Sequence, residues 1–506
     1  MITRDLTRNP AKKGCILTVA SNLQIIFSRS RKNSRRKIRM TRILAAITIA
    51  ALMLTGAVPS FAETLKASDV KVSPSAKINW EDGPSVIGTS AIIMDAGSGD
   101  ILYEKNIHDK RDPASITKVL NCLVVLETMD LDEEVTVTEE PVKIGCNIDL
   151  KVGETITVEE LLYAIMLPSA NDAAEVLAIA AGGSIDNFCD MMNERAARCG
   201  AVETNFTNPN GLNTWGQENH RTSAYDLAMI TKEAMTNPMF RKLVSTKRHT
   251  IPATNMSEAR KLRTTNYCMM EGKKLKTVTI NGEERSIVYK GCKGIKTGST
   301  GTAGECYCGY AKRGNTALIA ITLNATTMEE RFSDVIQLWD YGFSKYSTYT
   351  VAQSTTPIDD VKVKRGDKSK IEVGIKNDMD ITLNKGYDKE KITSELKLNE
   401  AALEVPVKKG QVLGTFTGYK EGAPVACQDV YALESVGKGG PLSYIGIADE
   451  DLPFFFIGLI SIIIVLILIR IVLVKMRRNK KMRRRAQRQR SVRRREREKE
   501  KNPFDF

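Results

Sequence analysis

The stretch that decides how this chain is interpreted is Asp112-Pro113-Ala114-Ser115-Ile116-Thr117-Lys118. The hydroxyl of Ser115 and the amine of Lys118 stand three residues apart, so a helix places them side by side on one face. Pro113-Ala114 suits a helix start, and the positive end of a helix favours a developing alkoxide beside a neutral amine. A desolvated Lys118 is then a general base for Ser115. A solvated helical pair is the alternative explanation of this motif on its own.

Two later motifs carry complementary groups. Ser169-Ala170-Asn171 places a hydroxyl and an amide in a tight turn. There Ser169 relays a proton, while Asn171 steadies Lys118 and binds a substrate amide; an ordinary helix cap is the alternative. Lys296-Thr297-Gly298 offers a cation and a hydroxyl to a carboxylate, and its glycine lets a substrate backbone approach as an added strand. A glycine-rich turn is the alternative there.

Together and in this order, the three motifs predict acyl transfer through a serine ester. This chemistry needs no histidine, metal or organic cofactor. The expected oxyanion donors are the backbone N–H of Ser115 and one from the strand near Ser299.

Hydrophobic periodicity around the motifs predicts a sheet built from both ends of the catalytic region, with a helical cluster inserted between them. Hairpins are expected at 91–103 and around Asn281-Gly282. Further strands are expected at 294–297, 304–311 and 317–323, and helices at 115–129, 157–166, 172–181, 186–199, 224–234 and 333–341.

After about residue 350 the pattern changes to short alternating strands with lysine–glycine turns, which predicts a small all-β module. The expected domains are a basic n-region and signal peptide at 1–62, a catalytic domain at 82–345, the all-β domain at 352–436, a linker at 437–452, a transmembrane helix at 454–474 and a basic cytoplasmic tail at 475–506.

The net charge of +14 is concentrated at the two ends of the chain. Residues 1–62 carry +11 and residues 475–506 carry +12, which leaves the middle acidic at −9. A domain that grips nucleic acid is basic over its binding face. The charge distribution therefore argues against nucleic acid as a partner. We interpret the tail as a solvated run or one that faces anionic lipid.

The basic ends flank two apolar segments. The first, at 43–57, ends in Pro59-Ser60-Phe61-Ala62 and predicts signal-peptidase cleavage before Glu63, with an uncleaved anchor as the alternative. The second, at 454–474, is long enough to cross a bilayer, and Arg470 is near enough to its end to snorkel. By the positive-inside bias, the flank that begins at Lys475 is cytoplasmic. The catalytic domain is therefore expected outside the cell, held to the cell membrane by a single helix.

Cysteine usage gives little evidence of a framework of disulfides or metals. Ten cysteines are present, nine of them after residue 62, and no pair has zinc-ribbon spacing. Cys306 and Cys308 fit alternate positions of a strand. We expect most cysteines to be small buried residues and leave their pairing open.

Longer segments around the motifs resemble the low-molecular-weight penicillin-binding proteins, the serine D-alanyl-D-alanine carboxypeptidases, over about residues 85–445. The segments that carry this resemblance are Asp112 to Lys118, Thr204-Asn205-Phe206-Thr207-Asn208-Pro209-Asn210-Gly211-Leu212, Thr222-Ser223-Ala224-Tyr225-Asp226-Leu227, Gly294-Ile295-Lys296-Thr297-Gly298-Ser299-Thr300 and Val407-Lys408-Lys409-Gly410-Gln411-Val412-Leu413-Gly414.

The resemblance implies an α+β catalytic domain of the penicillin-binding and serine β-lactamase type, with an antiparallel sheet, followed by a small all-β domain. It implies removal of the terminal D-alanine from peptidoglycan pentapeptides and covalent binding of β-lactam antibiotics. The implied catalytic residues are Ser115 as nucleophile, Lys118 as base, and Ser169 and Asn171 as relay and substrate contacts; the implied substrate-binding residues are Lys296, Thr297, Gly298, Ser299 and Arg331.

Two features depart from the family pattern. Ser299 stands where some members have a histidine, so only a backbone role is carried over to that position. The C-terminal anchor, an amphipathic helix in many members, is here long enough to span.

Rival functions make different predictions. Glu395-Leu396-Lys397-Leu398-Asn399 matches the deacylation motif of class A β-lactamases, but it follows the third motif instead of preceding it. A transpeptidase or endopeptidase uses the same acyl-enzyme, and the sequence does not separate water from an amine as acceptor. A non-catalytic wall-binding membrane protein would not need every catalytic position to be filled.

Overall fold

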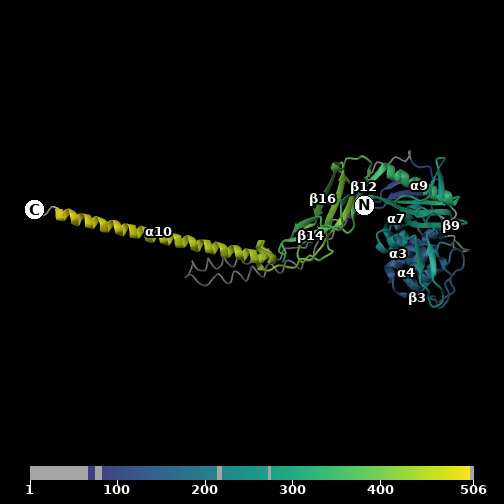
Figure 1. Cartoon of the computed structure of the whole chain (residues 1–506), viewed down its shortest axis with the longest axis horizontal. Helices are drawn as coiled ribbons and strands as arrows, with labels where there is room; N and C mark the ends of the chain where they lie inside the picture. Colours follow the sequence, from purple (N-terminus) through teal and green to yellow (C-terminus); the bar gives the residue numbers. More distant parts are fainter. Residues whose placement is uncertain (1–65, 74–82, 213–218, 272–274, 502–506) are drawn as a thin grey trace, which may run out of the picture. The chain divides into compact units, whose positions relative to one another are not determined.

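The computed structural model describes residues 66–73, 83–212, 219–271 and 275–501 (Figure 1). The expected signal peptide and Cys15 lie outside these residues. Five antiparallel strands form the central sheet, in the order β2 (Ile101–Lys105), β1 (Ser90–Asp95), β11 (Thr316–Ala325), β10 (Gly304–Arg313) and β9 (Cys292–Thr300). Because β1 pairs with β11, the sheet is built from both ends of the region, as the sequence predicts.

Alternating side chains give this sheet two buried faces. On β1, Ile92 and Met94 join the core of the helical cluster, whereas Ile93 joins a second core that contains Trp339. Trp339 belongs to α9 (Met328–Lys345), which packs on that second face. A capping box between Thr327 and Glu330 starts α9 five residues earlier than its hydrophobic pattern indicates.

The helical cluster inserted between β2 and β9 contains η4 (Ala114–Thr117), α3 (Lys118–Thr128), α4 (Val158–Met166), α5 (Asn171–Gly182), α6 (Ile185–Arg198), α7 (Ala224–Ala234) and α8 (Pro238–Ser245). Side-chain caps at Thr157, Ser184, Ser223 and Asn237 start four of these helices. Small hairpins complete the region: β3 (Glu134–Thr136) with β4 (Thr155–Thr157), β5 (Arg248–Ile251) with β6 (Arg260–Arg263), and β7 (Thr277–Ile280) with β8 (Glu283–Ser286). The last of these is the hairpin predicted around Asn281-Gly282.

The predicted all-β module is present. β12 (Tyr346–Ala352) pairs with β15 (Met379–Asn384), and a five-stranded sheet has the order β13 (Asp359–Lys362), β14 (Lys370–Gly374), β18 (Ala423–Ala432), β17 (Val412–Lys420) and β16 (Ile392–Leu398). Glu395 lies on β16 and pairs with Thr417 of β17. Short 3₁₀ turns lie at η2 (Ala67–Asp69), η5 (Lys389–Lys391), η6 (Glu400–Leu403), η7 (Pro441–Ile445) and η8 (Asp449–Asp451).

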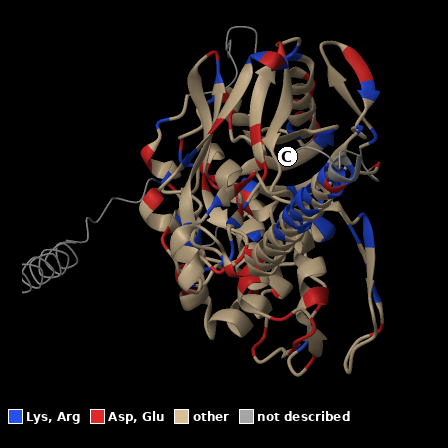
Figure 2. Cartoon of the chain, turned by 90° about the vertical axis from the view of Figure 1, so that its left-hand side faces the viewer, with Lys and Arg blue, Asp and Glu red and all other residues tan. Residues whose placement is uncertain are grey.

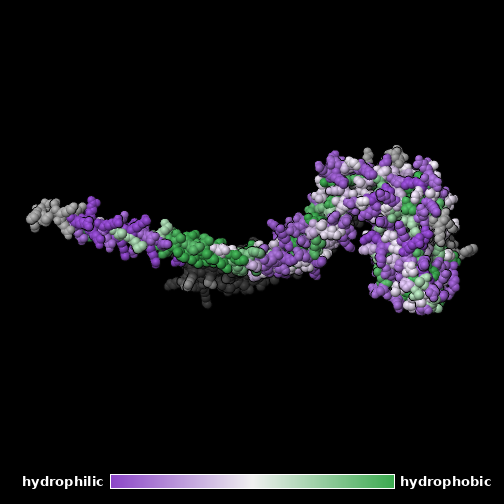
Figure 3. Space-filling view, in the orientation of Figure 1, coloured by the Kyte–Doolittle hydropathy of each residue, from purple (hydrophilic) through white to green (hydrophobic). Residues whose placement is uncertain are grey.

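One helix, α10 (Leu452–Lys501), carries both the apolar segment and most of the basic tail. It is long and apolar enough to cross a membrane, by length and composition. Figure 3 shows the apolar part of this helix, and Figure 2 shows the lysines and arginines along the rest. The expected boundary at residue 475 is thus a change of polarity without a break, because lysine and arginine are good helix formers.

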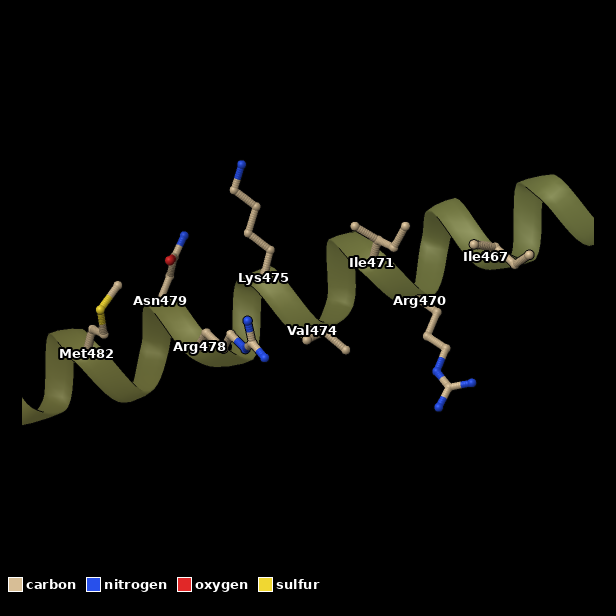
Figure 4. Close-up of a pocket in the computed structure, with 8 residues that line it drawn as sticks. All are labelled: Ile467, Arg470, Ile471, Val474, Lys475, Arg478, Asn479 and Met482. Atoms are coloured by element: carbon tan, nitrogen blue, oxygen red, sulfur yellow. The ribbon is translucent and has the colours of Figure 1, made fainter.

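The shallow pocket drawn in Figure 4 is the surface of this single helix rather than a ligand cavity. Arg470 and Lys475 point to different sides of α10 in that view. The residues that line it are Ile467, Arg470, Ile471, Val474, Lys475, Arg478, Asn479 and Met482.

Among the described cysteines none forms a disulfide, and most are buried, as expected. Cys306 and Cys308 occupy alternate positions of β10, as the sequence predicts.

Candidate active site

Ser115 and Lys118 meet where η4 passes into α3. The Nζ atom of Lys118 lies 3.0 Å from Ser115 Oγ, 2.7 Å from Asn171 Oδ1 and 2.6 Å from the carbonyl oxygen of Asn210. Asn171 Oδ1 and the carbonyl can only accept hydrogen bonds. A neutral amine has two N–H groups, so these two acceptors occupy both of them. In a neutral Lys118 the lone pair would then face the Ser115 hydroxyl, whereas in the ammonium form the third N–H donates to Ser115 Oγ.

Burial removes the Lys118 side chain from water. Its side chain has 0% exposure. Burial, and then the charge of Lys296, hold the pKa of Lys118 well below that of a free lysine. A general base must be neutral near its working pH. The alternative of a solvated helical pair is therefore wrong.

The second motif is built into the turn before α5. Ser169 has a left-handed backbone, with φ of 72°, and its buried Oγ has no hydrogen-bond partner among the described residues. Asn171 accepts from Lys118 and donates through Nδ2 to the carbonyl of Ile144 at 2.8 Å. The N-cap position of α5 belongs to Ala170, which makes no side-chain cap. The helix-cap alternative is therefore wrong, and the unpartnered Ser169 hydroxyl is available to a substrate.

The third motif lies within β9, at the edge of the central sheet. Lys296 is 1% exposed and donates to the carbonyl of Thr297 at 2.8 Å. Burial is the main reason that the pKa of Lys296 falls to about 7. The Thr297 hydroxyl lies 2.7 Å from that of Thr265. Because the motif is strand rather than turn, the alternative of a glycine-rich turn is wrong, and an edge strand can pair with an extended peptide.

Gly298 allows β9 to pack closely against the backbone of Pro113 to Ser115. A Cβ atom there would stand 3.0 Å from the Ser115 backbone nitrogen and from the carbonyl oxygen of Pro113. Arg331 lies behind the strand, where it donates to the carbonyl of Gly298 at 3.2 Å and forms an ion pair with Glu305.

Ser299 is exposed, and its hydroxyl donates to Glu305 at 2.8 Å. The predicted site residues thus lie on η4 and α3, in the turn before α5 and at the start of that helix, and on β9, which packs against η4; Arg331 is bonded to the backbone of β9.

Sequence reasoning missed three supporting residues. Asn210 gives its carbonyl to Lys118, and its side chain donates to Glu175 at 3.1 Å. The buried carboxylate of Asp172 accepts from the backbone N–H groups of Ile148, Leu150 and Ala173. His220 bonds to Thr117, which lies between Ser115 and Lys118 in the sequence.

A signal for two of these residues was present in the sequence. Asp172 directly follows the second motif, and Asn210 precedes a glycine. His220 had no such signal. Within the described ranges, no group of three or more His, Cys, Asp and Glu side chains is placed to hold a metal ion.

Comparison with known proteins gives this arrangement a family. Residues 77–327 match the D-alanyl-D-alanine carboxypeptidase family, and residues 346–438 match the C-terminal domain of penicillin-binding protein 5. The chain is 30% identical over 412 residues to the D-alanyl-D-alanine carboxypeptidase DacF of Bacillus subtilis, with 80% of this chain and 97% of that protein covered. It is 29% identical over 375 residues to DacC of Escherichia coli, with 71% and 86% covered.

A solved structure shares the fold. Penicillin-binding protein 5 of Haemophilus influenzae superposes with a TM-score of 0.52 at 24% identity, covering 70% of this chain and 99% of that one. The predicted fold class is confirmed. The chain belongs to the D-alanyl-D-alanine carboxypeptidase family of low-molecular-weight penicillin-binding proteins, serine hydrolases that bind peptidoglycan substrates and β-lactams.

Proposed function

We propose that this chain is a membrane-anchored carboxypeptidase that removes the terminal D-alanine from peptidoglycan pentapeptides through an ester on Ser115. One observation carries the assignment of residues: Lys118 is fully buried and its Nζ lies 3.0 Å from Ser115 Oγ. Burying a lysine without a carboxylate partner is costly, and such sites are found where the neutral amine is used.

Substrate binding begins at β9. The pentapeptide extends along this edge strand, and its terminal carboxylate is received by Lys296 and Thr297. Lys296 must be protonated in this step, and the incoming negative charge favours that form. Glycine at position 298 leaves room for the substrate backbone beside Ser115.

Acylation follows from the geometry of Lys118. Its lone pair takes the Ser115 proton while Oγ attacks the carbonyl carbon of the penultimate D-alanine. Backbone N–H groups of Ser115 and of the strand at Ser299 stabilise the oxyanion. Asn171 and the Asn210 carbonyl fix the Lys118 ammonium that results, because they accept its other two N–H bonds.

Breakdown requires a proton on the departing amine. Ser169 supplies this path, because its hydroxyl is buried in the site and has no competing partner among the described residues. D-alanine leaves and water then hydrolyses the ester, with Lys118 again as base. A β-lactam enters the same first step, but its ring-opened leaving group stays attached, so the ester persists.

The test is release of free D-alanine from a defined pentapeptide by the full-length protein in detergent. Wild type is expected to release D-alanine and to form a long-lived ester with fluorescent penicillin, and Ser115→Ala to do neither. Retained release by Ser115→Ala would refute the nucleophile. A cross-linked product in the presence of an amine acceptor would make the chain a transpeptidase, and rapid multiple turnover of penicillin would make it a β-lactamase.

For location, we infer a single-pass protein with its catalytic domain outside the cell and the basic end of α10 in the cytoplasm. The lysines and arginines after residue 474 support this orientation through the positive-inside bias. In intact cells, a cysteine-free background with one cysteine at exposed Val202 should react with an impermeant maleimide, and one at Val492 should not. The opposite labelling would reverse the topology.

A further inference from the structure

His220 is the most deeply buried of the three histidines, at 1% exposure, and it stacks on Phe206. It belongs to the short segment 219–222, which runs beside the residues that precede the nucleophile. Thr222 and Arg111 exchange backbone hydrogen bonds of 3.0 and 2.7 Å, and Arg221 forms an ion pair with Asp112. The segment therefore holds the chain just before Ser115 from outside its own helix.

The hydrogen bonds of His220 allow only one arrangement of protons in a neutral ring. The backbone N–H of Thr207 donates to Nδ1 at 3.0 Å, so Nδ1 is an acceptor and Nε2 carries the hydrogen. Nε2 lies 2.9 Å from Thr117 Oγ1, and this hydroxyl lies 2.9 Å from the carbonyl oxygen of Ala114. A carbonyl only accepts, so the Thr117 hydroxyl donates to Ala114 and receives from His220.

The hydrogen bonds that run from His220 through Thr117 end at Ala114, the residue before Ser115. Ala114 has φ of 48°, a conformation that an alanine adopts only when its surroundings impose it. Its carbonyl is held by Thr117 on one side and stands against Gly211 on the other. The orientation of Ala114 sets where the Ser115 N–H and hydroxyl point, because the two residues share a peptide plane.

We propose that His220 is a positioning residue for acylation: as a neutral Nε2–H tautomer it orients the Thr117 hydroxyl, which fixes the strained Ala114 peptide and thereby aims Ser115. This role rests on the proposed function of Ser115. Burial is the main reason that the pKa of His220 falls to about 3, so the ring stays neutral where a free histidine would titrate.

This chain of hydrogen bonds, from His220 through Thr117 to Ala114, predicts how substitutions in it change the rate of acylation. Thr117→Val keeps the shape of the side chain but removes the hydroxyl, and His220→Leu removes the donor. Each is expected to lower the rate of acylation at saturating penicillin by about 10- to 100-fold, since a displaced nucleophile loses the attack geometry. The dissociation constant of the non-covalent penicillin complex should change little, because neither substitution alters Lys296 or Thr297, the proposed carboxylate-binding residues on β9.

The double variant is the decisive measurement. Both substitutions interrupt the same chain of hydrogen bonds, so the variant that carries Thr117→Val and His220→Leu should acylate no more slowly than the slower single variant. Thr117→Ser and His220→Gln, which keep a hydroxyl and a side-chain N–H donor, should recover most of the rate. His249→Leu is the matched control, because His249 also stacks on an aromatic ring, that of Tyr163, but bonds to Glu160.

The ring itself can be observed in full-length protein labelled with ¹⁵N-histidine. The His220 signals should show a protonated Nε2 and a bare Nδ1 that do not titrate between about pH 5 and 8. The proposal would be overturned if the falls in acylation rate multiplied in the double variant. A wild-type rate in folded Thr117→Val, or a charged His220 ring at pH 7, would also overturn it. Ser115→Ala should abolish acylation outright, so failure of the positioning role is distinguishable from failure of the proposed nucleophile.

Discussion

Replacing Gly211 by alanine tests whether Ser115, the proposed nucleophile, is held from outside its own helix. Gly211 has φ of 83°, and a Cβ atom built there would lie 1.9 Å from the carbonyl oxygen of Ala114. Contacts under 3.0 Å do not occur for real Cβ atoms, so one of the two segments must move by about 1 Å or more. A shift of that size at a reacting group costs roughly 100-fold in rate, or about 2.7 kcal/mol of activation free energy.

Gly282 supplies a control with the same backbone. It also has φ of 83°, in the turn between β7 and β8, but no atom lies within 4 Å of its built Cβ. Alanine at either position therefore carries the same left-handed penalty of about 1–2 kcal/mol. Only Gly211→Ala adds the collision with Ala114.

The assay is the second-order rate of acylation by fluorescent penicillin, measured well below the melting temperature of each variant. Gly282→Ala should acylate at the wild-type rate with a slightly lowered melting temperature, and Gly211→Ala about 100-fold more slowly. Equal acylation rates in the two variants would show that the Gly211 contact does not position Ser115.

Two further outcomes follow from charge and hydrogen bonding. The cationic form of Lys296 is lost as pH rises through its pKa of about 7, so kcat/KM for a carboxylate-terminated peptide should fall above that pH. Lys296→Arg should move this fall to higher pH. If the fall stayed at the same pH in Lys296→Arg, Lys296 would be excluded as its source. Asp172→Ala leaves three backbone N–H groups without their acceptor and should lower the free energy of unfolding by about 2–4 kcal/mol in urea titration. A loss under about 0.5 kcal/mol, the size of an ordinary surface substitution, would contradict the assigned role.

Much of the fold could be predicted because its signals are local. The continuous apolar runs of β1 and β11, the hairpin at Asn281-Gly282 and the apolar run of α10 each follow from neighbours in sequence. The start of α9 was missed because a capping box extends it beyond its apolar stripe. The site residues of the three motifs were named from their chemistry, and their assigned roles stay predictions until the variants are measured.

The alternatives for each motif were decided only by tertiary contacts. No local pattern distinguishes a solvated Ser–Lys pair from a buried one, and Asn171 is as good a helix cap in sequence as it is a ligand of Lys118. His220 carried no signal, because its partners Thr117 and Thr207 stand 103 and 13 residues away.

The functional groups of this protein can be named from its sequence alone: a serine, two lysines, an asparagine and a second serine, on a chain with one long apolar helix near its C-terminus. The tertiary structure decided their state. The pKa of Lys118 is low because the core removes water from it, and residues 53 and 92 positions away accept its N–H groups. Desolvation sets the pKa of Lys118 and long-range contacts set the orientation of Ser115, and neither exists until the chain is folded.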